Sequence, residues 1–165
     1  MSNLSTLASS LNTHRADAAL IAQVCVGLVR SWAGGKDLDD MYRGLLTTAA
    51  DSSGVDQMVY QLEGDPGYAE NAALIVLSAA WGYPELQDEI RNLAAAARAT
   101  PRAVSSTELA QSVLYGMFLM ARNGAQVKEV AYRNAHGDIE VQAVGSALSA
   151  ASLFDSVRDQ YAASL

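Results

Sequence analysis

The sequence predicts a mainly α-helical bundle with one small β-hairpin before the C-terminal helix. Three observations lead to this fold class. Half of the 165 residues are hydrophobic and proline occurs three times, a composition that favours packed helices over disorder. Apolar residues recur every three or four positions along most of the chain, as in helices that bury one face. Between residues 128 and 143 the period changes to two, which indicates strands.

The helix expected over Ser105–Gly124 is the buried centre of the predicted bundle. Ser105 and Glu108 fit a capping box, in which a hydroxyl accepts from an amide three residues on and the carboxylate reaches back. The Asn-Gly pair at the other end tolerates the left-handed conformation that ends helices. No face of Val113–Ala121 is polar, so the helix must be surrounded by protein. We expect Gly116 to permit close approach of a second helix.

The other helices are placed by apolar spacing and by the glycine, proline or capping residues at their ends. Residues 1–12 are expected to be either a flexible end or a short amphipathic helix. Further helices are expected over about 13–32, from 37 or 38 to about 50, over 55–62, 72–81 and 85–99, and at the C-terminal end over about 148–161. All of 1–165 is expected to form a single domain, since its length is sufficient for one substantial core.

The hairpin is predicted from alternating residues on either side of a turn over 134–138. We expect one face to carry the apolar side chains and to dock on the C-terminal helix: Val130, Tyr132, Ile139, Val141 and Ala143. Two strands leave unpaired backbone groups along both edges, so we expect an edge to add a strand from another chain. Gln142 lies on such a strand, and its amide points either outward or to the sister strand.

Charge and cysteine content exclude several classes of protein. The net charge of −7 argues against binding to nucleic acid, which needs clustered Lys and Arg. Cys25 is the only cysteine, so neither an internal disulfide nor a thiolate metal site is expected, and the cytoplasm is the expected location. We see no segment typical of a signal peptide or a membrane span, and we expect no cofactor.

Candidate catalytic and metal-binding residues are few. His136 and Asp138, on the hairpin turn, form the best catalytic-looking cluster, but turn chemistry explains both residue types and no nucleophile is spaced nearby. His14 and Asp17 lie three apart without further ligands, so we expect no metal site. We therefore assign no catalytic residue.

Candidate binding residues fall into three groups. Trp81 and Tyr83 bracket a glycine at a helix corner, where large rings serve either as interface anchors or as lids over the core. Met117, Phe118 and Met120 are expected either to pack in the core or to line an adaptable groove. The third group is on the hairpin: Tyr132, His136 and Gln142.

These observations favour a non-enzymatic protein-binding module, such as an adaptor, a dedicated chaperone or an inhibitor or immunity protein. Its expected partner is another protein or a second copy of itself, without nucleic acid or membrane. One alternative is a helical sensor that binds a small ligand in an apolar pocket. The other is an enzyme that uses His136 and Asp138.

Overall fold

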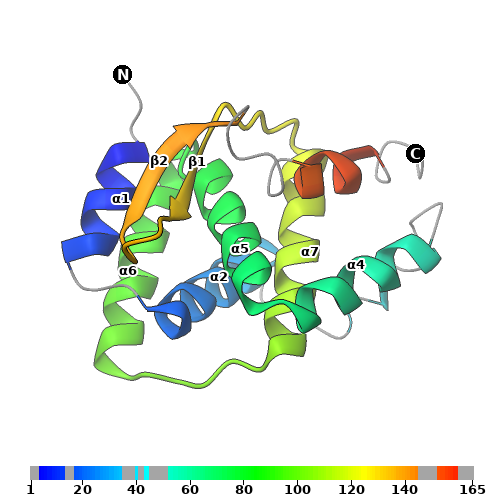
Figure 1. Cartoon of the computed structure of the whole chain (residues 1–165), viewed down its shortest axis with the longest axis horizontal. Helices are drawn as coiled ribbons and strands as arrows, with labels where there is room; N and C mark the ends of the chain where they lie inside the picture. The colour runs from blue at the N-terminus through cyan, green and yellow to red at the C-terminus, as the bar shows by residue number, and fades with distance from the viewer. Residues whose placement is uncertain are drawn as a thin grey trace.

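The computed structural model describes residues 4–13, 17–34, 40, 43–44, 52–144 and 152–159. Within these ranges the chain is mainly helical, with an antiparallel hairpin before the last short helix, so the predicted fold class is confirmed (Figure 1). The helices are α1 (Leu4–Thr13), α2 (Ala18–Trp32), α4 (Ser52–Gly64), α5 (Pro66–Ala80), α6 (Pro84–Ala99), α7 (Ser106–Arg122) and a short helix over 152–159. The strands are β1 (Glu129–Arg133) and β2 (Ile139–Ala143).

Some expectations fall on parts of the chain that lie outside the described residues. Of the helix expected to begin at residue 37 or 38, only Asp40, Arg43 and Gly44 are described, and all three are helical. Residues 145–151, which follow Val144, and those from 160 onward are also outside the described ranges. The expected N-terminal helix is present as α1.

Helix α7 is the buried centre of the bundle, as predicted, and it packs against α2, α4 and α5. The Ser105 side chain accepts from the amide of Glu108 at 3.1 Å, but the Glu108 carboxylate does not complete the capping box. It pairs instead with Arg30 and Arg102, at 3.0 and 3.1 Å. The N-terminal end of α7 is therefore tied to α2 as well as capped.

Gly116 marks the closest approach of α7 to two other helices. A Cβ added there would lie 2.9 Å from a methyl of Val29 on α2 and 3.0 Å from a methyl of Val76 on α5. The expectation that this glycine permits close helix packing is confirmed. Because both neighbours are buried β-branched side chains, little room exists for them to move.

Helices α4, α5 and α6 follow one another with short connections. The sequence predicts a turn at residues 64–67; in the structure a single residue, Asp65, separates α4 from α5. Its carboxylate accepts from the amide of Tyr68 at 3.1 Å and so caps α5. At the other end Trp81 ends α5, and Pro84 occupies the first turn of α6 as predicted.

The hairpin register differs from the expectation that all its apolar residues share one face. Ala131 pairs with Val141 and Arg133 with Ile139, and residues directly opposite one another point to the same side. Val130 and Tyr132 therefore share the other face with Gln142 and Glu140. The expectation was wrong because the five-residue connection between the strands sets the register, and the apolar pattern of each strand alone does not.

Both faces of the hairpin consequently contribute to the core. Val130, Ala131 and Ile139 are only 1 %, 1 % and 2 % exposed. Strand β1 packs mainly on α5, and strand β2 packs mainly on α1. These contacts hold the hairpin between the two helices (Figure 1). The 152–159 helix approaches the start of the hairpin, because Phe154 and Arg158 line one pocket together with Lys128 and Val144.

Candidate functional site

The two hairpin edges are defined by the alternation of backbone hydrogen bonds. Asn134 donates to the carbonyl of Asp138 at 2.8 Å, and Val144 donates to the carbonyl of Lys128 at 3.0 Å. In an antiparallel pair such bonded partners recur every second residue, so even-numbered residues bond the sister strand and odd-numbered residues face outward. The amide of Gln142 therefore points to β1, which resolves the two orientations that the sequence leaves open.

Side chains of the protein itself occupy part of each outer edge. On β1 the amide of Ala131 donates to the hydroxyl of Ser78 on α5 at 2.9 Å, and this hydroxyl donates to the carbonyl of Leu74 at 2.6 Å. On β2 the side chain of Asn12 accepts from the amide of Ile139 at 2.7 Å and donates to its carbonyl at 2.8 Å. These positions are not available to a strand from another molecule.

A cleft lies at the start of the β1 outer edge, and it also contains one of the predicted binding residues. Its volume is about 280 Å³. Its walls come from the end of α5, the start of α6 and the start of β1: Ser78, Trp81, Pro84, Gln87, Lys128 and Glu129. We call it the Trp81 cleft. Glu129 is odd-numbered, so its backbone amide and carbonyl face outward along this edge.

Trp81 forms the floor of this cleft. It is 3 % exposed, which makes it mainly a lid over the core, and the guanidinium of Arg91 lies 4.9 Å from its ring centroid. The side-chain amide of Gln87 donates to the backbone carbonyl of Trp81 at 2.6 Å. Tyr83 is half-buried beside it and packs edge-to-face on Trp32, with ring centroids 5.9 Å apart. The corner is therefore preorganised by its own contacts.

The far end of the hairpin is held by charged and polar groups. The guanidinium of Arg133 pairs with Glu70 on α5 at 2.6 Å and donates to the carbonyl of Gly137 at 2.7 Å. The Tyr132 hydroxyl donates to Glu140 on the opposite strand at 2.8 Å. This hydrogen bond lowers the pKa of Glu140 and raises the pKa of Tyr132. Tyr132 thus links the two strands on the face that also carries Val130.

His136 and Asp138 lie on the exposed turn, and their backbone amides are hydrogen-bonded within it. The side-chain oxygen of Asn134 accepts from both of their amides, at 2.9 and 3.0 Å, and Gly137 has a φ of 88°. This is the turn chemistry that the residue types indicate. Asp17 caps α2 through the amide of Leu20, while His14 lies outside the described residues.

The remaining candidates lie in the core. Met117, Phe118 and Met120 are 0 %, 5 % and 0 % exposed and pack within the hydrophobic cluster. Cys25 is fully buried, and burial raises the pKa of its thiol to about 12. Of the sequence-predicted binding residues, the structure therefore brings Trp81 to the hairpin edge and leaves the methionine stretch inside the protein.

Sequence reasoning missed the residues that shape the hairpin edges. Ser78 is a lone polar residue in the apolar run of α5, a signal that could have suggested a buried bonding partner. Asn12 lies within α1 and bonds a strand residue 127 positions away, which no local pattern indicates. Gln87 and Lys128 carry no sequence signal for the cleft.

Two broader observations concern the same described residues. No three His, Cys, Asp or Glu side chains gather there in a way that could hold a metal ion. The helices in those ranges all lack the length and apolar character that crossing a bilayer requires. Comparison of the chain with known protein families, curated proteins and solved structures finds no match.

Proposed function

We propose that this chain is a non-enzymatic protein-binding module that receives an extended segment of its partner at the Trp81 cleft. The observation that carries the proposal is the position of the cleft along the outer edge of β1, where the backbone groups of Glu129 face outward. An extended segment placed there can bond β1 through its main chain while one of its side chains enters the cleft. Such a module would act as an adaptor, a dedicated chaperone or an inhibitor or immunity protein.

The chemistry of the cleft indicates what kind of segment fits. Leu4 and Trp81 supply apolar surface, and Gln87 and Gln126 supply amides that can both donate and accept. Lys128 is exposed and makes no ion pair with any described residue. A segment with one apolar side chain and a neighbouring carboxylate would complement these groups, whether it comes from another protein or from a second copy of this chain.

The edge contacts already described explain why the addition would be short. The Ser78 hydroxyl already accepts a hydrogen bond from the amide of Ala131, which lies two residues along the edge from Glu129. A partner strand would therefore bond β1 at its start and then leave the edge. A cytoplasmic location is part of the proposal, supported by Cys25, a buried free thiol of the kind that a reducing compartment preserves.

Photocrosslinking from the rim of the cleft tests the proposal. A benzophenone amino acid replaces Gln126, which is exposed at the rim, and in a control protein it replaces Tyr60, which is 78 % exposed on α4. Both proteins are expressed in the native cell and the crosslinked species are identified by mass spectrometry. We expect a defined partner, or a dimer, from position 126 and not from position 60.

A pair of substitutions at Glu129 then separates strand addition from contact with the side chain. Glu129→Pro removes an outward amide at the first residue of β1, where proline is tolerated, whereas Glu129→Ala keeps the amide. We expect both variants to melt like the wild type, and only the proline variant to lose the crosslink. Equal capture by both variants, or equal crosslinking from position 60, would contradict the proposal.

A further inference from the structure

A second cavity lies at the opposite end of α5, where α4, α5 and the 152–159 helix meet. It is a pocket of about 330 Å³ that opens to solvent, and we call it the Gln61 cavity. Tyr68 lies in the first turn of α5 and Trp81 follows its last residue, so the two sites are about 20 Å apart along the helix axis at 1.5 Å per residue. The Gln61 cavity is therefore separate from the Trp81 cleft.

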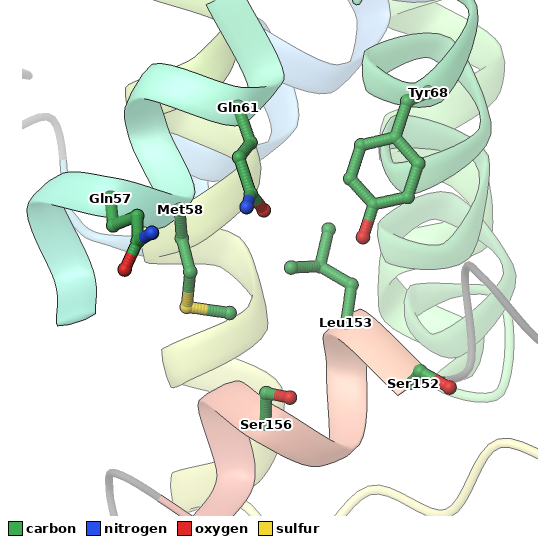
Figure 2. A pocket seen from close by; sticks show the side chains of 7 residues that line it. All are labelled: Gln57, Met58, Gln61, Tyr68, Ser152, Leu153 and Ser156. Atoms are coloured by element: carbon green, nitrogen blue, oxygen red, sulfur yellow. The ribbon is translucent and has the colours of Figure 1, made fainter.

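The lining of this cavity is uncharged and rich in hydrogen-bonding groups. Among its seven described lining residues, none carries a formal charge, and five have an amide or a hydroxyl: Gln57, Gln61, Tyr68, Ser152 and Ser156. Amides and hydroxyls both donate and accept. The polar ends of Gln61 and Tyr68 point from α4 and α5 toward the same space above Leu153 (Figure 2).

Apolar surface completes the cavity on one side. Met58 and Leu153 are buried and form its floor, and the half-buried ring of Tyr68 forms a wall. The backbone of Tyr68 is held in place, because its amide donates to the carboxylate of Asp65 at 3.1 Å. The cavity thus presents apolar surface from three helices beside a rim of neutral donors and acceptors.

We propose that the Gln61 cavity binds a neutral polyhydroxylated ring of about the size of a monosaccharide. Such a ring has C–H groups on its faces, which match the Tyr68 and Leu153 surfaces, and hydroxyls at its edge, which match the amides and serines. The volume lies at the small end of the range for ligand sites, about 300–1,000 Å³, which suits one ring and not a long chain.

The electrostatics of the cavity disfavour an anion. A charged ligand loses hydration on entry and finds no counter-charge among the seven lining residues. Burial, and then the nearby Asp65 carboxylate, raise the pKa of Tyr68, so the phenol stays a neutral donor and the local potential is negative. A phosphorylated sugar would therefore bind more weakly than its neutral parent.

Titration of the full-length, ¹⁵N-labelled protein by NMR tests this inference. The neutral probes are glucose, N-acetylglucosamine and myo-inositol, and glucose 6-phosphate and glucosamine carry the same ring with a negative or a positive charge. We expect at least one neutral probe to give saturable shifts at Gln61, Tyr68 and Ser156, with a dissociation constant in the millimolar range. Glucose 6-phosphate should bind at least fivefold more weakly than glucose, whereas the positive charge of glucosamine should cost less affinity because the local potential is negative.

Matched variants show whether the shifts report this cavity. Gln61→Leu removes an amide while keeping similar bulk, and we expect it to weaken binding of the neutral probe about tenfold. Gln23→Leu makes the same change on α2, at a residue that lines neither site, and should leave the affinity unchanged. Absence of saturable shifts with all three neutral probes, tighter binding of glucose 6-phosphate, or equal loss in both variants would overturn the inference.

Discussion

Two buried serines, Ser78 on α5 and Ser112 on α7, differ in whether their hydroxyl is hydrogen-bonded. Comparing their alanine variants therefore measures what that hydrogen bonding contributes to stability. The Ser78 hydroxyl accepts from Ala131 at 2.9 Å and donates to Leu74 at 2.6 Å. The Ser112 hydroxyl is fully buried, and no described group bonds it. Replacing each serine with alanine removes the same atom from the interior of a helix.

The two replacements should have opposite effects on stability. Each gains about 0.5 kcal/mol of helix propensity. Ser78→Ala also leaves the amide of Ala131, which is 1 % exposed, without an acceptor, and an orphaned buried donor costs about 1–3 kcal/mol. Ser112→Ala removes a hydroxyl that already lacks a partner, so its net effect should be a stabilisation of roughly 0.5–1 kcal/mol. The variants should therefore differ by about 1–3.5 kcal/mol in free energy of unfolding.

Urea unfolding monitored by circular dichroism measures both free energies, and hydrogen exchange of the Ala131 amide identifies the cause. We expect faster exchange of this amide in Ser78→Ala and unchanged exchange in Ser112→Ala. If the two free energies of unfolding agree within about 0.5 kcal/mol, the Ser78 bridge does not hold β1 on α5 and the edge assignment loses its main support.

Two further outcomes follow from the packing. Gly116→Ala should destabilise the protein by about 1–3 kcal/mol, because the new methyl group meets Val29 and Val76. The control Gly64→Ala should not destabilise it, because a methyl group there meets nothing within 4 Å. Thermal melting of the two variants measures the difference. Cys25 should resist a thiol reagent at pH 8 until the protein unfolds, because its thiol is buried with a pKa of about 12, and rapid reaction of the folded protein would contradict its placement.

Local chemistry was enough to predict much of the fold. The ends of α7 follow from Ser105 and the Asn-Gly pair, and the start of α6 follows from Pro84, because caps and proline act within a few residues of themselves. The burial of α7 follows from a run with no polar face. In each case the information lies within one stretch of sequence.

The candidate site was harder to predict because it depends on contacts between distant stretches. The hairpin register follows from the geometry of its connection, so the apolar pattern placed Val130 and Ile139 on one face when they lie on opposite faces. Trp81 was recognisable as a large ring at a corner, but its place beside β1 depends on how α5 packs against the hairpin. Neither relation has a local signature.

The two hydrogen bonds between Asn12 and Ile139 also bear on the order in which the protein folds. Bringing two residues 127 positions apart into contact costs about 4 kcal/mol of chain entropy beyond a constant, so this pair cannot form early. We expect it to form after the helices have brought α1 and β2 together, and contacts that form late act on the rate of unfolding and hardly on the rate of folding. Replacing Asn12 should therefore change how long the β2 edge stays closed once the protein is folded, and not how quickly the bundle assembles.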